Sequence, residues 1–498
     1  MRTRIAPAPR QSGSVSVDVP VVVLLSRWLL VAACLSTGNV LHAQAMGGGR
    51  NPLGPFLFSD TTVFAIRDVR VIDGTGAPAR AHQTLVIRDG VIAAVGDTER
   101  VDVPPDALVI DGAGKSVMPG LVMLHEHFFL PTGSIGSWFG ESGVRLFLAA
   151  GVTSIRTSGD VNGYATIALK QQIDRGMKPG PWIDAAAPFL QGQGGPPMAA
   201  YALTSADDAR RYVDFWADAG ATSFKAYTHI TRDQLAAAIE RAHARGLKVT
   251  LHSCSVTFRE AVELGIDNLE HGFFTLTDFV ASKEPDVCPS FFNPGGRSIV
   301  SADTASEEFR SLIRLLVDRH VALTSTLPVF ESAIPTRPMP PGTEVLAPQL
   351  RELADSVYRL RQQYPPSAFA ELYPKAAALE VAFVRAGGVL LAGSDAGSGQ
   401  GSVVPGFANQ RELELLVEAG LTPLEALKIG TLNGATYLNR SETIGSIAVG
   451  KQADLVLVDG DPSVQIADVR NVVIVFKVGR AFDPVKLIDS VRGWVGIY

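Results

Sequence analysis

One stretch decides how this sequence is interpreted, and it reads Met118-Pro119-Gly120-Leu121-Val122-Met123-Leu124-His125-Glu126-His127. Its apolar part is typical of a buried strand, and the strand ends in two histidines at positions i and i+2. Side chains two apart on a strand project to the same side, so both imidazoles can reach one metal ion. A lone pair of this kind is a weak signal, because two unrelated histidines can end a strand by chance. Its weight depends on the rest of the chain.

Short apolar strands alternate with amphipathic helices from residue 117 to about residue 440, which is typical of a parallel α/β fold. The candidate strands end near Leu124, Ile155, Ile183, Phe224, Leu251, Leu269, Leu323 and Leu391. Eight strands in this order predict a (β/α)8 TIM barrel, a fold of ~250 residues or more with insertions. Capping boxes at Thr231, Thr257 and Thr422 support the predicted helix starts.

Further ionisable residues lie at the carboxyl ends of these predicted strands. They are Lys225, His252, His271 and Asp395. Active sites of TIM barrels lie at this end of the barrel, so we expect the side chains to converge with the two histidines. Two long connections, residues 188–203 and 325–374, belong to the same face and are predicted to bind substrate or act as a lid. Inserts without a function are the alternative.

The barrel is predicted to be inserted into a small β-sandwich domain. Residues 61–116 alternate apolar and polar positions, with turns at Asp73-Gly74 and Asp89-Gly90. Residues 441–498 return to strand character and end in a C-terminal tail. We expect both segments to form one domain, preceded by a flexible, Gly- and Pro-rich lead over residues 46–60.

Residues 1–45 are interpreted as a signal peptide, because arginines precede an apolar run and Ala43-Gln44-Ala45 resembles a cleavage site. This predicts a periplasmic or secreted protein with no membrane span after cleavage. A membrane anchor is an alternative, although Ser26 and Arg27 interrupt a run shorter than the ~20 residues of a spanning helix. A lipoprotein anchored at Cys34 is another alternative.

Composition narrows the function class further. The 498 residues carry a formal net charge of −6, are 46% hydrophobic and 19% charged, and contain no basic tract. These values indicate a globular enzyme and argue against nucleic acid as a partner. The cysteines Cys34, Cys254 and Cys288 show no CxxC spacing, so neither a disulfide scaffold nor a cysteine zinc site is expected. Cys254 is interpreted as a small buried residue, and histidines and carboxylates must hold any metal.

Lys225 is unusual because an inward-facing lysine on a barrel strand is costly to bury as a cation. Carboxylation by CO2 would convert it into a carbamate whose two oxygens can bridge metal ions ~3.5–4 Å apart. An ion pair with Glu270 or Asp395 is the alternative.

Taken together, these motifs resemble the amidohydrolase superfamily, in its imidazolonepropionase-like and prolidase-like (Xaa-Pro dipeptidase type) branch. The resemblance covers most of the chain after residue 45. Its elements are Val71-Ile72-Asp73-Gly74, Ile87-Arg88-Asp89-Gly90, residues 119–127, Gly151-Val152-Thr153-Ser154-Ile155-Arg156, Phe224-Lys225-Ala226-Tyr227, His252, Glu270-His271-Gly272, Gly393-Ser394-Asp395, residues 412–423 and Gly450-Lys451-Gln452-Ala453-Asp454-Leu455.

The resemblance implies a binuclear centre of two divalent ions, with zinc the expected metal. His125, His127 and Asp395 would hold one ion, His252 and His271 the other, and carboxylated Lys225 would bridge them. A metal-bridging hydroxide would attack the substrate, with Asp395 as general acid and base. Tyr227 could stabilise the oxyanion or bind substrate, or be a core tyrosine. His229 could face the pocket mouth or cap a helix.

Two positions depart from the family's common pattern. Asn409 and Gln410 stand before Arg411-Glu412-Leu413, where many relatives carry a histidine, so the substrate contact of that histidine is not carried over. Glu126 is a less usual residue between the two histidines, and alternation predicts that it faces away from the metals.

The predicted reaction is hydrolysis of an amide bond, in a dipeptide or an N-acyl amino acid. Lactone, ester or phosphotriester hydrolysis on the same centre stays open. Deamination is disfavoured because Ser255 occupies the position of the deaminases' glutamate. A non-catalytic binding protein is the competitor from another class. The partner is expected to be a small molecule, and a homo-oligomer is left open.

Overall fold

The computed structural model describes residues 51–132, 135–196, 201–289, 298–299, 302–363, 368–398 and 401–496. The predicted signal peptide, Cys34 and residues 46–50 of the lead lie outside these ranges, as do residues 197–200 and 364–367 of the two long connections. Within them, no helix combines the length and apolar character needed to cross a membrane.

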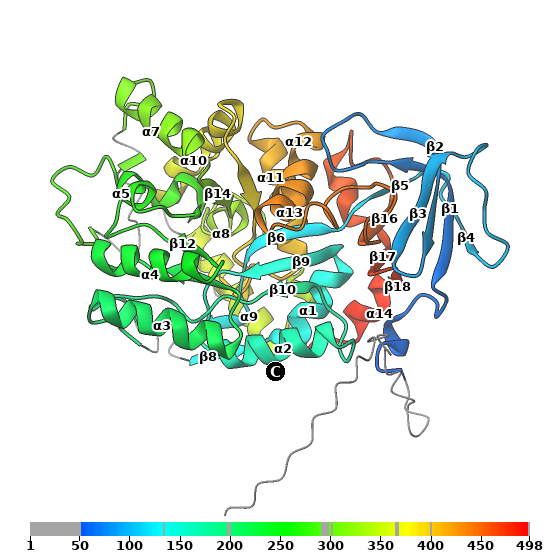
Figure 1. Cartoon of the computed structure of the whole chain (residues 1–498), viewed down its shortest axis with the longest axis horizontal. Coiled ribbons are helices and arrows are strands. Elements are labelled where there is room, and N and C mark those ends of the chain that lie inside the picture. The colour runs from blue at the N-terminus through cyan, green and yellow to red at the C-terminus, as the bar shows by residue number, and fades with distance from the viewer. Residues whose placement is uncertain are drawn as a thin grey trace, which may run out of the picture. The chain divides into compact units, whose positions relative to one another are not determined.

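Eight short parallel strands form the central part of the molecule (Figure 1). They are β6 (Leu121–Glu126), β9 (Val152–Thr157), β10 (Trp182–Asp184), β11 (Ser223–Ala226), β12 (Lys248–Leu251), β13 (Asn268–Glu270), β14 (Ala322–Ser325) and β15 (Leu390–Ala392). One sheet has the order β10-β9-β6 and the other the order β11-β12-β13-β14-β15. Each strand end predicted from the sequence falls within one of these strands.

Backbone contacts join the two sheets into a barrel. Parallel bridges from Ala186 to Ser223 and from Leu190 to Ala226 connect the chain after β10 with β11. On the other side, the amide of Asp395 donates to the carbonyl of His125 at 2.9 Å, which connects the end of β15 with β6. Gly393 permits this approach, because a Cβ atom there would lie 2.4 Å from that of His125. The predicted TIM barrel is confirmed.

Helices lie outside the strands (Figure 1). They are α1 (Gly140–Ala149), α2 (Gly163–Asp174), α3 (Ala206–Ala219), α4 (Arg232–Ala244), α5 (Phe258–Glu263), α7 (Glu307–Asp318), α8 (Leu327–Glu331), α9 (Pro348–Gln362), α10 (Ala368–Arg385), α11 (Phe407–Glu418), α12 (Pro423–Lys428), α13 (Gly434–Tyr437) and α14 (Pro484–Asp489). The capping boxes at Thr231, Thr257 and Thr422 begin α4, α5 and α12 as predicted. The long connection after β14 contains α8 and α9 and is therefore largely helical.

A second sheet combines strands from both ends of the chain. Its members are β1 (Val63–Val71), β2 (Arg80–Arg88), β3 (Val91–Asp97), β4 (Leu108–Asp111), β5 (Lys115–Pro119), β16 (Leu455–Asp459), β17 (Val472–Lys477) and β18 (Arg480–Phe482). The antiparallel pair β5–β16 joins the two segments. Alternate apolar side chains, among them Phe64, Leu85 and Phe476, form a common core.

Two short elements complete the connections around the fold. The hairpin of β7 (Phe129–Thr132) and β8 (Ile135–Trp138) follows β6 directly. Residues 51–58 of the predicted flexible lead are packed against the second sheet, where Leu53 and Leu57 are buried and the amide of Phe58 donates to the carbonyl of Ala481 at 2.8 Å.

Candidate metal centre

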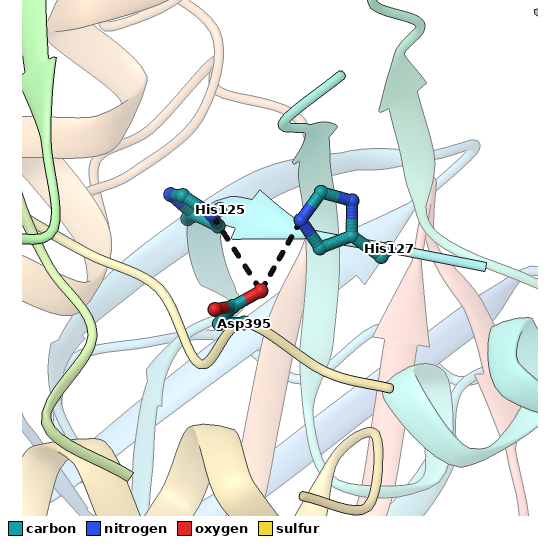
Figure 2. A group of neighbouring side chains, drawn as sticks. All are labelled: His125, His127 and Asp395. Carbon is teal, nitrogen blue, oxygen red and sulfur yellow. Dashed lines mark ion pairs between the residues drawn. The ribbon is translucent and has the colours of Figure 1, made fainter. Parts of the chain in front are cut away.

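The end of β6 and the turn after β15 bring three predicted ligands together. The Nε2 atoms of His125 and His127 lie 3.7 Å and 3.2 Å from Oδ1 of Asp395. Figure 2 shows both rings beside the carboxylate. Among the residues that the structure describes, these three form the group whose ligand atoms all lie within 4.8 Å of one another. The sequence predicts this same set for the first ion.

Lys225 reaches the same point from β11. Its Nζ atom lies 3.2 Å from Nε2 of His125, and its side chain is fully enclosed. Burial lowers the pKa of this amine to about 8. No ion pair within 4.0 Å joins Lys225 to Glu270 or Asp395 in the described part of the chain, although the charge of each carboxylate acts on it.

His252, after β12, and His271, after β13, complete the group. The centroid of the His271 ring lies 4.3 Å from that of His125 and 4.5 Å from that of His252. Burial lowers the pKa of both side chains well below the usual value, which keeps the imidazoles neutral. Nδ1 of His271 lies 2.9 Å from Oγ1 of Thr326, whereas Nδ1 of His252 is buried and has no hydrogen-bond partner within the part of the chain that the structure describes.

Outer contacts orient the two histidines of β6. Nδ1 of His125 donates to Oε2 of Glu270 at 2.7 Å, and Nδ1 of His127 donates to the carbonyl of Gly159 at 3.1 Å. Each ring therefore presents the lone pair of its Nε2 atom to the cluster. Arg156 is completely buried and donates to Oε1 of Glu270 at 2.5 Å, so the Glu270 charge is paired.

The donor set fits divalent metal. Neutral imidazoles and an ionised carboxylate are the ligands that zinc and similar ions take. Nδ1 of His252 is buried and has no hydrogen-bond partner among the described residues, so its lone pair, in the tautomer that leaves it unprotonated, would be satisfied by coordination. Burial opposes ionisation of Asp395, but the surrounding histidines His125, His127 and His271 outweigh it and hold the pKa of this carboxyl well below its usual value.

Comparison with known proteins now decides the family. The model of the amidohydrolase family matches residues 116–280 and 374–488, which is more than half of the chain. The chain belongs to the amidohydrolase family. Short segments match curated members: 40% identity over 96 residues with a dihydroorotase of Anaeromyxobacter dehalogenans and 56% over 43 residues with an imidazolonepropionase of a Geobacillus strain. These segments cover 21% and 10% of the two relatives, and 19% and 9% of this chain.

Solved structures match over far greater lengths. A putative prolidase from Bifidobacterium longum is 26% identical, with a TM-score of 0.63, over 86% of this chain and 98% of that one. A bottromycin amidohydrolase shares 20% identity, with a TM-score of 0.65, over 89% and 92% of the two chains. At 20% identity, the similarity to the bottromycin amidohydrolase shows only that the two chains share a fold. The predicted resemblance to prolidase-like and imidazolonepropionase-like proteins is confirmed.

The two residues predicted to contact substrate differ in their surroundings. Tyr227 is buried against Phe129 and Phe189, and burial raises the pKa of its hydroxyl well above the ordinary value, so the phenol stays protonated. His229 is only partly buried, and its Nδ1 lies 2.9 Å from Oγ1 of the adjacent Thr228. The ring of His229 is therefore hydrogen-bonded to its own segment.

The two departures from the family pattern occupy one buried network. Glu126 is enclosed and bonded to Ser394 and Asn409, so it does face away from the histidine cluster as predicted. Asn409 uses its Nδ2 for Glu126 and its Oδ1 for the amide of Gly406. Gln410 donates to the carbonyls of Ala150 and Val469. Neither amide is left to take over the substrate contact of the relatives' histidine.

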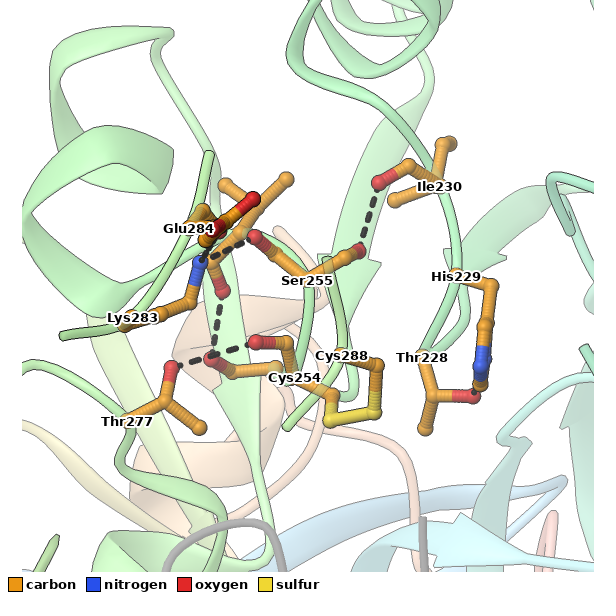
Figure 3. The surroundings of a disulfide bond; sticks show 11 residues. Thr228, His229, Ile230, Cys254, Ser255, Thr277, Lys283, Glu284 and Cys288 are labelled. Carbon is orange, nitrogen blue, oxygen red and sulfur yellow. Dashed lines mark hydrogen bonds between the residues drawn. A yellow bond between two sulfur atoms is a disulfide. The ribbon is translucent and has the colours of Figure 1, made fainter. Parts of the chain in front are cut away.

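A disulfide joins Cys254 to Cys288, with their Cα atoms 4.8 Å apart (Figure 3). The prediction of a chain without a disulfide framework, with Cys254 as a plain buried residue, is therefore wrong. The two cysteines lie 34 positions apart, and only the fold brings the loops after β12 and β13 together. Lys283 reinforces the contact, because its Nζ donates to the carbonyl of Ser255 at 2.6 Å.

Two functional contacts could not be read from the sequence. Arg156 lies within a quoted motif, yet only the structure shows that it pairs with Glu270 behind His125. Thr326, which bonds His271, follows β14 without any pattern of its own. An arginine among apolar residues near the end of a strand was the available signal for the first.

Proposed function

We propose that this chain is an exported, metal-dependent amidohydrolase that cleaves an amide bond in a dipeptide or an N-acyl amino acid. The observation that carries the proposal is the meeting of His125, His127 and Asp395 at the carboxyl end of the barrel. Lys225, His252 and His271 adjoin this group, and these contacts support a common site for the six proposed ligands.

The binuclear arrangement assigns each residue to one ion. His125, His127 and Asp395 would hold the first divalent ion and His252 and His271 the second, with zinc the expected metal. Bound there, the two ions would lower the pKa of a water molecule and polarise the substrate carbonyl.

Carboxylated Lys225 would contribute one carbamate oxygen to each ion. Its pKa of about 8 favours this modification, because a neutral amine can attack CO2 and release a proton to give the carbamate anion. The 3.2 Å contact with His125 places its nitrogen beside the first set of ligands.

Asp395 is the proton carrier in this proposal. Its low pKa keeps it ionised, so it can accept a proton from the attacking water and pass it to the leaving amine nitrogen. Tyr227 stays protonated and is able to donate to an oxygen that gains charge in the transition state.

The walls beside the metal ligands favour a substrate with an apolar group. Phe129, Phe189 and Tyr227 form a cluster with Val161, and the rings of the first two lie 4.8 Å and 6.2 Å from the ring of His127. On the other side, Phe330 lies 5.9 Å from the ring of His271. Aromatic faces bind apolar and planar groups well, so we expect bulky apolar residues next to the scissile bond.

Metal analysis tests the centre itself. We expect about two ions per chain in the purified protein and loss of at least one in Lys225→Ala. Lys248→Ala is the matched control, because this partly buried lysine begins β12 at the opposite end of the barrel. Retention of both ions in Lys225→Ala would exclude the bridging role, and a carbamate signal after incubation with ¹³C-labelled bicarbonate would support it.

A substrate screen tests the reaction. The metal-loaded protein is assayed against dipeptides, N-acyl amino acids, lactones and phosphotriesters, and we expect turnover of amides with a large apolar residue. Turnover restricted to lactones or phosphotriesters would replace the proposed reaction by the alternative. Bound metal without turnover of any compound would favour a binding protein.

The disulfide supports export, because such bonds persist in the periplasm and outside the cell and are rare in the cytosol. N-terminal sequencing of the protein recovered from a secreting host is expected to begin just after Ala45. A retained N-terminus or a lipid-modified Cys34 would contradict signal-peptide cleavage at that site.

A further inference from the structure

Glu126 lies between the two histidines of β6, but its side chain is hydrogen-bonded to the turn after β15 and to helix α11. The amide of Ser394 donates to Oε1 of Glu126 at 3.1 Å, and the hydroxyl of Ser394 donates to Oε2 at 2.5 Å. Nδ2 of Asn409 donates to Oε1 at 2.6 Å. Glu126, Ser394 and Asn409 are all 0% exposed. In each of these three bonds the carboxylate of Glu126 is the acceptor.

The turn whose Ser394 donates two of these bonds also carries Asp395. Its φ angle of +56° lies in the left-handed region, which residues with a side chain rarely adopt, so this conformation needs support from its surroundings. That support comes from two adjacent residues of β6. The carbonyl of His125 accepts the amides of Ser394 and Asp395, at 3.2 Å and 2.9 Å, while the side chain of Glu126 binds Ser394.

Asn409 extends the network to helix α11. Its Oδ1 accepts the amide of Gly406 at 2.9 Å, immediately before the helix begins, while its Nδ2 holds Glu126. Gly406 has a φ angle of +80°, and a Cβ atom there would lie 2.3 Å from the carbonyl oxygen of Leu146. The start of α11 is thus fixed in place, and Asn409 transmits that fixed position to the carboxylate of Glu126.

We infer that Glu126 and Asn409 form a paired positioning device that holds the Ser394–Asp395 turn in the geometry that the first metal subsite requires. The inference rests on the proposed function, since it assigns Asp395 a metal. It also explains why both departures from the family pattern occur together: each is the other's hydrogen-bond partner. Neither residue touches substrate or metal, so each acts through Asp395.

Metal affinity of the full-length mature protein is the decisive measurement, made by competition with a chromogenic zinc chelator. We expect Glu126→Ala to weaken binding of one of two zinc ions 10- to 100-fold, the range observed when a group behind a metal ligand is removed. Glu126→Gln is expected to lose less than about fivefold, because its Oε1 can still accept and the Ser394 hydroxyl can turn to accept from Nε2. The visible spectrum of the Co²⁺-loaded protein should change in Glu126→Ala and stay close to that of the wild type in Glu126→Gln.

Asn409 supplies an independent variant should Glu126→Ala fail to fold. Asn409→Asp places an acceptor opposite an acceptor and is expected to weaken the same ion, whereas Asn409→Ala in the Glu126→Ala background should add little. Gln410→Ala is the matched control, since it removes a neighbouring buried amide that bonds only backbone carbonyls. It should lower stability while leaving both zinc affinities unchanged.

The outcomes separate this inference from the proposed function. Wild-type protein that binds no metal would overturn the proposed function. Wild-type protein that binds two ions, with Glu126→Ala and Asn409→Asp equal to it in affinity and Co²⁺ spectrum, would overturn the positioning role alone. If Gln410→Ala weakened zinc binding to the same degree, the removal of any buried polar side chain near α11 would have this effect. That result would also overturn the positioning role of Glu126 and Asn409.

Discussion

The two halves of the ligand cluster are built differently. On the β6 and β15 side, His125 is fixed by Glu270, His127 by the carbonyl of Gly159, and Asp395 by backbone bonds and the Ser398 hydroxyl at 2.9 Å. On the β12 and β13 side, His271 has one bond to Thr326 and His252 has none at Nδ1.

The second half is held by the chain around it. The disulfide begins two residues after His252 and ties that loop to the segment following β13. Behind His271, Gly272 packs against the carboxylate of Glu380, where a Cβ atom would lie 1.8 Å from Oε1. The His125, His127 and Asp395 side is thus organised by hydrogen bonds to its side chains, whereas the His252 and His271 side is organised by a covalent link and by packing.

The largest effect is expected for Asp395→Asn, which removes the proposed proton acceptor from the side held by hydrogen bonds. We expect kcat/KM on the best substrate of the screen to fall about 10²- to 10⁴-fold, the range for loss of a general base. Asp454→Asn is the control, because Asp454 is a buried carboxylate paired with Lys477 in the second sheet. Activity within about tenfold of the wild type would exclude the proton-carrying role.

Loss of the disulfide should act on the other half. Closing a loop across 34 positions predicts that Cys254→Ser with Cys288→Ser lowers the free energy of unfolding by about 3–4 kcal/mol. Urea denaturation measures this loss. Zinc titration should show that the ion proposed at His252 and His271 is weakened more than the ion proposed at His125, His127 and Asp395. Reduction of the wild type with dithiothreitol should reproduce both results. Equal weakening of the two ions would contradict the separation of the halves.

The sequence predicted the barrel well, because its signals are local. Apolar strands and capping boxes are written within a few residues, and the order of strand and helix leaves few alternatives. The same holds for His125 and His127, whose spacing on one strand determines that they share a side. Lys225, His252, His271 and Asp395 follow from the rule that barrel sites gather at the carboxyl ends of strands.

The features that the sequence could not predict are contacts between segments that lie far apart along the chain. The bond between Cys254 and Cys288, the contact of Arg156 with Glu270 and the union of Glu126 with Asn409 each require the folded backbone. The sequence showed that Glu126 and Asn409 each depart from the family pattern, but it did not show that the two side chains are hydrogen-bonded to each other.

Glu380→Gln tests the packing on the His252 and His271 side, where Glu380 lies against Gly272. Burial raises the pKa of Glu380 to about 8 from 4.5, against the lowering effect of the neighbouring Ser325. Between these pH values the unfolded chain releases a proton that the folded chain keeps, so wild-type stability falls as pH rises. Glutamine does not titrate, and we expect the variant to gain about 3 kcal/mol relative to the wild type between pH 5 and pH 8.

Urea denaturation across this pH range measures the difference. Glu425→Gln provides a control of opposite sign, because the bond from Arg385 lowers the pKa of Glu425 to about 2. Its wild-type contribution is present above pH 4.5 and is lost as pH falls toward 2, so this variant should be less stable at neutral pH. A pH-independent difference for Glu380→Gln would show that the group is ionised in the folded protein.

The smallest effect is expected for Thr326→Val, which removes the single recorded hydrogen bond to His271 and keeps the side-chain shape. Loss of a group behind a ligand should weaken the second ion about tenfold, at the low end of the usual range, and leave the first ion unchanged. Thr443→Val removes an exposed hydroxyl bonded to the carbonyl of Arg440 and serves as the control. Equal weakening of the binding of both ions by Thr326→Val would contradict two separately organised sites. A bond to His271 would then also determine the affinity at His125 and His127, and the two sites would form one coupled unit.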